Sequence, residues 1–117
     1  MPMPASTADS SKDRLHGTLD ILVLKTLSWG PSHGYAIARW LEETTEQTVQ
    51  IEEGSLYPAL YRMERKGWIE AEWGLSELGR KAKFYRITAV GRRHLKSETA
   101  EWTKLARAIA LVLTPAK

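Results

Sequence analysis

Hydrophobic residues near the start of the chain recur at helical spacing. They predict a first helix from Leu15 or Thr18 to Trp29. Its apolar stripe consists of Leu15, Leu19, Leu22, Val23 and Leu27. Ile21 and Leu24 add apolar groups on the other side, and a helix that is apolar nearly all round is buried on more than one side. In so short a chain, a second subunit could supply the second burying surface.

Two shorter helices are predicted next. The second runs from Gly34 to Glu46, with a buried stripe of Ile37, Trp40 and Leu41. The third lies within Gly54–Gly67, where Ser55 is expected as the N-cap. Pro58 then falls at the third helical position, where its missing N–H costs no intrahelical bond. A helical wheel places Leu56, Ala59, Leu60 and Met63 on the core side, and Pro58, Tyr61, Arg62 and Arg65 on the opposite side.

The pattern then changes to the alternation of strands. Over Ile69–Trp73 apolar residues alternate with glutamates, and over Lys83–Ile87 the residues Lys83, Tyr85 and Ile87 alternate with Phe84 and Arg86, with an expected hairpin tip at Gly74–Arg80. Thr88 is the predicted N-cap of a last helix that reaches Leu113, before Pro115 stops it. Apolar residues in a heptad-like spacing form a seam along one side of this helix, and such a seam favours packing against a partner helix. Its residues are Leu95, Trp102, Leu105, Ile109 and Val112.

The order of elements predicts a mainly α fold with a β-hairpin wing: a winged helix-turn-helix followed by a long C-terminal helix. A chain of 117 residues is about one domain in size. We expect a flexible tail over residues 1–13, a DNA-binding domain over residues 14–88 and a dimerisation helix over residues 89–117.

Composition excludes several classes of protein. The chain has no cysteine, which rules out disulfides and Cys-ligated metals. It has neither an apolar run long enough to span a bilayer nor a secretory signal, so a soluble cytoplasmic protein is expected. The three histidines are scattered and no catalytic motif is present, so we expect no enzyme activity, no metal and no cofactor. His33 is expected as a turn or cap residue.

Charge is unevenly distributed along the chain. Residues 39–61 contain one base and five acids, whereas residues 62–96 contain ten bases and four acids. The basic block suggests a face that meets a polyanion, although solvated surface charges would give the same composition. Arg80, Lys81 and Lys83 form the basic hairpin, which can lie along a DNA backbone or enter a minor groove. The exposed face of the third helix suits a major groove.

Four stretches resemble the PadR family of bacterial transcriptional regulators: LHGTLDILVLKTL (15–27), HGYAIARWL (33–41), GSLYPALYRMERKGWI (54–69) and RKAKFYRITAVGRRHL (80–95). The resemblance implies a homodimeric winged helix that binds palindromic operator DNA, usually as a repressor. The first and last helices would form the dimer. Some family members are released from DNA by small aromatic molecules, so a small-molecule effector is expected here without an assigned identity.

The residues and the resemblance together define two candidate sites. The candidate DNA-binding residues are Tyr35, Ser55, Tyr57, Pro58, Tyr61, Arg62, Lys66, Arg80, Lys81 and Lys83. The candidate dimer or effector residues are Leu15, Leu19, Leu22, Leu95, Trp102, Leu105, Ile109 and Val112. Two alternatives stay open for single residues: Tyr57 contacts DNA or packs on a neighbouring helix, and Trp102 is a packing anchor or a ligand platform. The runner-up function is a protein–protein adaptor that uses the same surfaces.

Overall fold

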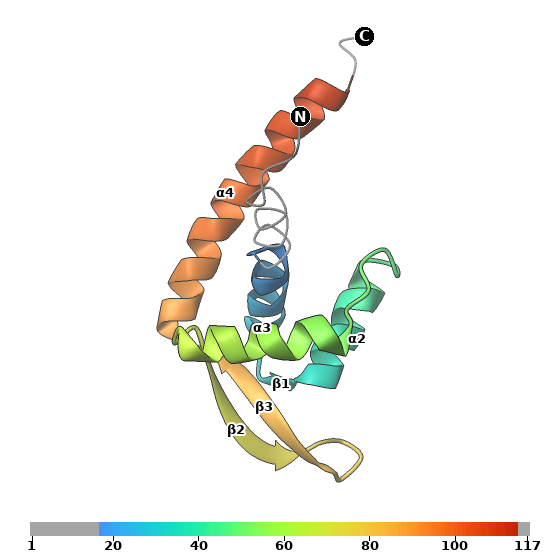
Figure 1. The fold of residues 1–117 in the computed structure, drawn as a ribbon, viewed down its shortest axis with the longest axis vertical. Coiled ribbons are helices and arrows are strands. Elements are labelled where there is room, and N and C mark those ends of the chain that lie inside the picture. Colours follow the sequence, from blue (N-terminus) through green and yellow to red (C-terminus); the bar gives the residue numbers. More distant parts are fainter. Residues whose placement is uncertain (1–16, 115–117) are drawn as a thin grey trace, which may run out of the picture.

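The computed structural model describes residues 17–114, and its elements follow the predicted order (Figure 1). A first helix covers residues 17–27. The remaining elements are β1 (Ser32–His33), α2 (Gly34–Thr44), α3 (Glu53–Arg65), β2 (Ile69–Leu75), β3 (Lys81–Ile87) and α4 (Ala89–Leu113). The predicted tail over residues 1–13, the candidate dimer residue Leu15 and the helix stop at Pro115 lie outside the described residues.

One hydrophobic core joins the three short helices to the base of the hairpin. The predicted core side of α3 is confirmed, because Leu56, Ala59, Leu60 and Met63 are all fully buried. The first helix contributes Val23, Leu24 and Leu27, and Leu19 also belongs to this core. Leu19 is therefore buried by its own chain, while Leu22 is only partly buried at the edge of the core.

In α2 the predicted cap is confirmed and the predicted stripe is wrong at one position. The Nδ1 atom of His33 accepts a hydrogen bond from the backbone N–H of Ala36 at 3.3 Å. Ile37 and Leu41 are buried, but Trp40 is exposed. Position 40 lies at the side of the narrow stripe that runs through Ile37 and Leu41, so its large ring extends past the edge of the core.

The start of α3 also differs from the prediction. Glu52, not Ser55, is the N-cap, and its side chain makes no capping bond. The helix begins three residues earlier because Glu53 is favoured in the first turn by the helix dipole. Pro58 therefore lies at the sixth helical position, where its lack of an N–H leaves the carbonyl of Gly54 without its usual donor.

The strands form a three-stranded antiparallel sheet in the order β1-β3-β2. β2 and β3 are longer than predicted, which shortens the tip of the hairpin to residues 76–80. β1 is not predicted from the sequence, because a two-residue strand is too short to show alternation. It pairs Ser32 with Tyr85 and His33 with Phe84, and so ties the start of α2 to the hairpin.

A close backbone contact joins the start of α4 to the turn between α3 and β2. Thr88 is the N-cap of α4, as predicted, and its Oγ1 accepts from the N–H of Gly91. The same hydroxyl lies 2.6 Å from the carbonyl oxygen of Gly67, and the Thr88 N–H donates to the carbonyl of Trp68. The imidazole of His94 stacks on the indole of Trp68 at 3.8 Å between ring centroids.

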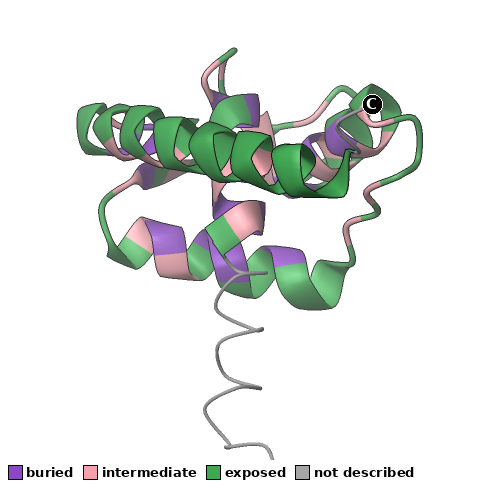
Figure 2. Ribbon diagram, turned by 90° about the horizontal axis from the view of Figure 1, so that it is seen from above, coloured by how far each residue is buried: buried purple, intermediate pink, exposed green. Residues whose placement is uncertain are grey.

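Most of α4 lies away from the core. Leu95 is buried, but the other four seam residues, Trp102, Leu105, Ile109 and Val112, are exposed in the single chain. Figure 2 shows the exposed colour along α4 toward the C-terminal end. Although α4 has 25 residues, neither it nor another helix in the described range is apolar enough over the required length to cross a membrane.

Gly91 is the position at which the contact with Trp68 leaves no room for a side chain. A Cβ atom there would lie 2.1 Å from the Trp68 carbonyl oxygen and 2.9 Å from a side-chain carbon of Ile87. We expect Gly91→Ala to lower the free energy of unfolding by about 2 to 3 kcal/mol, because α4 must shift to accept the methyl group. Urea unfolding at a fixed protein concentration measures the change.

Gly54→Ala is the matched control for this prediction. No atom lies within 4 Å of a Cβ at Gly54, which is also helical, so alanine there leaves stability equal or slightly higher. Equal stability of Gly91→Ala and the wild-type chain would contradict the close packing.

Candidate nucleic-acid interface

A groove of about 640 Å³ lies between the hairpin, the first residues of α2 and Tyr57 of α3. Five of the ten candidate DNA-binding residues line it: Tyr35, Tyr57, Arg80, Lys81 and Lys83. Trp73 and Tyr85 add aromatic surface to its wall. The groove therefore combines cationic and aromatic side chains from three parts of the sequence.

The register of the hairpin explains why its lysines face this groove. Lys83 pairs with Trp73 and Lys81 with Leu75, and directly paired residues share a face of the sheet. At the base of the hairpin the same face of the sheet packs on α3 through the buried pair Ile69–Ile87. The Nζ atom of Lys81 lies 5.6 Å from the centre of the Trp73 ring.

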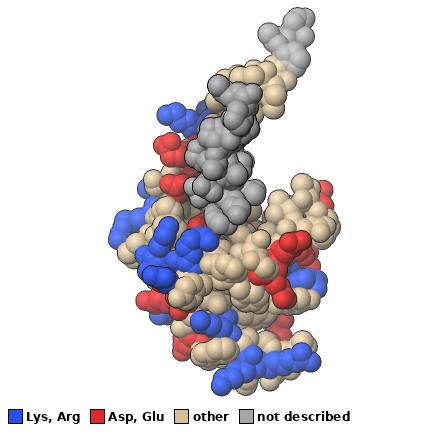
Figure 3. Space-filling model, in the orientation of Figure 1, with Lys and Arg blue, Asp and Glu red and all other residues tan. Residues whose placement is uncertain are grey.

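The hairpin cations differ in how far they are neutralised. Lys83 lies 3.5 Å from a carboxylate oxygen of Glu64 in α3. Arg80 and Lys81 form no ion pair with any residue in the range 17–114. Figure 3 shows Lys and Arg side chains gathered at the end of the hairpin, at the bottom of the view. The positive charge available to an anion is therefore greatest at the tip.

Tyr57 packs against the start of α2. A Cβ atom at Gly34 would lie 2.8 Å from the Tyr57 hydroxyl oxygen, so only glycine leaves room for the ring. Tyr57 nevertheless remains about half exposed. Nearby, the Tyr35 hydroxyl accepts a hydrogen bond from Arg39, which also pairs with Glu43 at 2.9 Å. The two tyrosines thus present hydroxyl groups beside the groove.

The far end of α3 forms a second cationic area. Tyr61, Arg62, Arg65 and Lys66 line a shallow recess of about 300 Å³. The guanidinium of Arg65 lies 5.7 Å from the centre of the Tyr61 ring, and Lys66 lies 4.8 Å from that of Trp68. Ser55 and Pro58 are exposed on the same helix but line neither the groove nor this recess.

Arg62 makes an internal ion pair. Its guanidinium donates to a carboxylate oxygen of Asp20 in the first helix at 2.6 Å. The Asp20 side chain is 9% exposed and that of Arg62 is 28% exposed. Arg62 is also one of the candidate DNA-binding residues, and in the structure its guanidinium joins α3 to the first helix.

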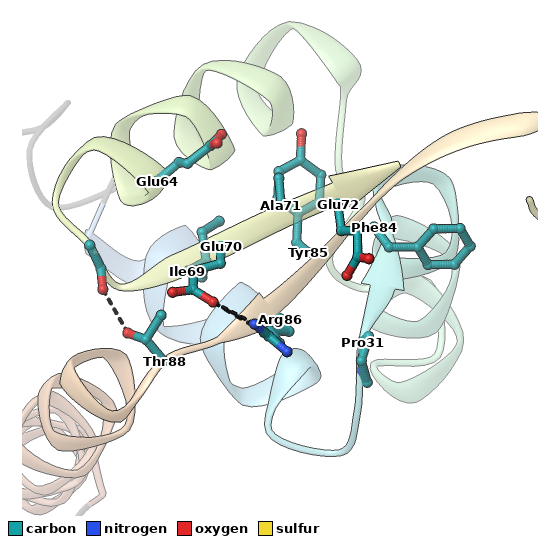
Figure 4. Close-up of a pocket in the computed structure, with 11 residues that line it drawn as sticks. Pro31, Glu64, Ile69, Glu70, Ala71, Glu72, Phe84, Tyr85, Arg86 and Thr88 are labelled. Carbon is teal, nitrogen blue, oxygen red and sulfur yellow. Dashed lines mark hydrogen bonds and ion pairs between the residues drawn. The ribbon is translucent and has the colours of Figure 1, made fainter. Parts of the chain in front are cut away.

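An acidic recess of about 530 Å³ lies along another part of the hairpin and α3 (Figure 4). It contains the carboxylates of Glu64, Glu70 and Glu72. The one guanidinium in its lining, Arg86, pairs with Glu70 at 2.7 Å. Burial, reinforced by the charge of Glu64, raises the pKa of Tyr85, which extends between the recess and the groove. The carboxylates of this recess repel phosphate, so the cationic side of the hairpin is the one that faces the groove.

Several residues around the groove and α3 are not predicted from the sequence. Trp73 was predicted as an apolar residue of the hairpin, but it is 62% exposed beside the groove. Leu78 at the tip also lines the groove and was not singled out. Asp20 was missed as the partner of Arg62, although a lone acid in an otherwise apolar helix was the available signal.

Comparison of the sequence with known families matches residues 23–97 to the transcriptional regulator PadR-like family. The chain is also 34% identical over 101 residues to Uncharacterized protein X of Lysinibacillus sphaericus. That alignment covers 86% of this chain and 93% of the relative.

Solved structures show the same fold. A transcriptional regulator from Clostridium thermocellum is similar with a TM-score of 0.76 and 30% identity, over 88% of this chain and 99% of that one. A PadR-like transcriptional regulator from Bacillus cereus has a TM-score of 0.74 and 30% identity, over 88% and 98% of the two chains. The predicted winged-helix fold is thereby confirmed.

The ion pair between Arg62 and Asp20 predicts a loss of stability when Arg62 is removed. Arg62→Ala leaves the largely buried Asp20 carboxylate without this partner, and we expect the free energy of unfolding to fall by about 2 kcal/mol. Urea unfolding monitored by circular dichroism measures it. The matched control is Arg65→Ala in the same helix, an exposed position with no ion pair in the described range, which changes stability by less than about 0.5 kcal/mol. Equal effects of the two variants would rule out a structural role for the pair.

Proposed function

The chain belongs to the PadR-like family of transcriptional regulators, and on that premise we propose that it is a homodimeric, sequence-specific DNA-binding repressor. The observation that carries the proposal is the cationic groove between the hairpin and the exposed side of α3. When a DNA duplex presents its major groove to α3, its sugar-phosphate backbone reaches the cationic groove of the protein.

We assign roles to the candidate residues by their place in this arrangement. Ser55, Tyr57, Pro58 and Tyr61 lie on exposed parts of α3 and would face the major groove. Arg80 and Lys81, which have no ion pair within residues 17–114, would contact phosphate from the hairpin. Tyr35, Lys66 and Lys83 would add backbone contacts at the edges. Arg62 contributes through the position of α3, since its guanidinium is held by Asp20.

The carboxylates at the start of α3 alter one expected contact. Glu52 and Glu53 lie at the positive end of the helix dipole, where the free N–H groups of a helix otherwise favour a phosphate. A phosphate there would meet two like charges. The proposal therefore places the main phosphate contacts on the hairpin instead.

The dimer is proposed to form through α4. Trp102, Leu105 and Ile109 are exposed on one side of α4, and a second copy would cover them. In this proposal residues 14–88 form the DNA-binding domain and residues 89–117 the dimerisation segment. Two-fold symmetry then requires a palindromic operator with half-sites about one helical turn apart.

Repression and its release by a small-molecule effector complete the proposal, and their support is the family resemblance. Trp102, half exposed on α4, would form one wall of an effector site between the two copies or anchor the dimer by packing. Both roles need the same dimer.

The proposed DNA contacts predict a specific change in salt dependence. Duplexes selected by the chain from a random pool serve as probes in mobility shifts at several salt concentrations. Arg80→Ala should weaken binding to selected and random duplexes alike and reduce the salt slope by about one unit, because one phosphate contact is lost. Arg86→Ala is the matched control, since Arg86 pairs with Glu70 in the acidic recess, and its slope should equal that of the wild type.

Two results would contradict this function. A wild-type chain that enriches no duplex from the pool favours the protein–protein adaptor. If Arg80→Ala leaves the salt slope of binding unchanged, the phosphate contacts lie elsewhere than on the hairpin.

The proposed dimer predicts that a charge on the seam separates the copies. Ile109→Glu should convert a species of two chains into one chain of 13.2 kDa, because a carboxylate would be buried among apolar residues. Sedimentation equilibrium at micromolar concentration measures the mass. Leu111→Glu is the control, because Leu111 is exposed on the opposite side of α4 and should leave the mass at two chains. Dissociation by both variants, or by neither, contradicts the seam.

A further inference from the structure

The tip of the hairpin, residues 76–80, displays a leucine on a closely bonded turn. Leu78 is 81% exposed, although its side chain is apolar. The N–H of Ser76 donates to the carbonyl of Arg80 at 2.8 Å, and the N–H of Gly79 donates to the carbonyl of Ser76 at 2.9 Å. The Ser76 Oγ also accepts from the Arg80 N–H at 3.3 Å. These bonds fix the turn, so Leu78 is held in place without packing on the core.

The left-handed conformation of Gly79 belongs to the same turn. Its φ of 76° is a conformation that other residues rarely adopt, and it lets the chain reverse immediately after Leu78. The leucine is therefore at the outermost part of the hairpin.

Leu78 faces the same groove as the aromatic residues of α2 and α3. It lines that groove together with Tyr35 and Tyr57, and Arg80 and Lys81 lie beside it. Glu77 is the one acid of the tip. An apolar side chain is thus placed beside two cations, on the side of the hairpin toward the exposed face of α3.

This combination matches the minor groove of a DNA duplex. Phosphates line both edges of a minor groove and attract Arg80 and Lys81, while the space between the edges accepts an apolar side chain. We propose that Leu78 is a minor-groove wedge, a side chain that inserts between two stacked base pairs, partly unstacks them and bends the duplex. The proposal rests on the proposed DNA-binding function and assigns it a residue that determines sequence preference.

The wedge would select sequence without a hydrogen bond to a base. Pyrimidine–purine steps such as TA and CA unstack and kink more easily than other steps. The chain should therefore prefer such a step at the place where the hairpin tip meets each half-site. Leu78 would act there by indirect readout, separately from the contacts of α3 in the major groove.

The experiment uses the full chain and duplexes selected by it from a random pool. 2-Aminopurine replaces adenine at successive positions, since its fluorescence rises when a base is unstacked. The wild-type chain should raise the fluorescence at one step in each half-site. Leu78→Ala should lose this rise and bind about tenfold more weakly, with the salt slope unchanged because the cations remain. Leu78→Met keeps an apolar side chain of similar size and should keep both signals.

Leu75→Ala is the matched control in the same hairpin. Leu75 is 71% exposed and does not line the groove, so its replacement should leave fluorescence and affinity as in the wild type. The wedge proposal is overturned if the Leu78→Ala variant raises the 2-aminopurine fluorescence as the wild type does. It is also overturned if Leu75→Ala lowers fluorescence and affinity as much as Leu78→Ala does. In either case wild-type binding to the selected duplex still upholds the DNA-binding function. Failure of the wild-type chain to select any duplex overturns both.

Discussion

The close contact between the first turn of α4 and the backbone of Trp68 is the constraint on which the arrangement of the whole chain depends. Gly91 provides the space, Thr88 caps α4 and bonds to the preceding turn, and His94 stacks on the indole. The end of α3, the start of β2 and the start of α4 all meet within this contact. The direction of the long helix is therefore fixed relative to both the exposed face of α3 and the hairpin.

Charge is separated on the two sides of the hairpin by strand alternation. Residues that pair across β2 and β3 share a face, so Lys81 and Lys83 fall with Trp73, while Glu70 and Arg86 fall together on the other face. The acids of that other face neutralise Arg86 and repel phosphate. A net charge of only +3 is thus compatible with a local cationic patch, because Arg80 and Lys81 lie together at the tip of the hairpin with no ion pair in the described range.

The sequence predicted those parts of the fold that follow local rules. Helical periodicity identified the core side of α3, and the capping preference of threonine identified the start of α4 at Thr88. Contacts between distant residues left weaker signals. The pair of Asp20 with Arg62 spans 42 positions, and β1 exists only because β3 is present to pair with it. Ser55 was misplaced as a cap because cap preference alone ignores that Glu53 can begin the helix earlier.

The exposed apolar seam of α4 and the fixed start of this helix at Trp68 together determine the geometry of the proposed dimer. If α4 were free to swing about its start, a second copy bound along the seam would leave the two DNA-facing grooves at variable distance. The Gly91 contact removes that freedom, so the geometry of the proposed dimer is set by where along α4 the two helices meet. Trp102 lies eleven positions beyond Gly91, about 16 Å along the helix, well outside the core. In the proposed dimer, a molecule that changes the angle between the two helices at Trp102 would therefore also change the distance between the two hairpin tips.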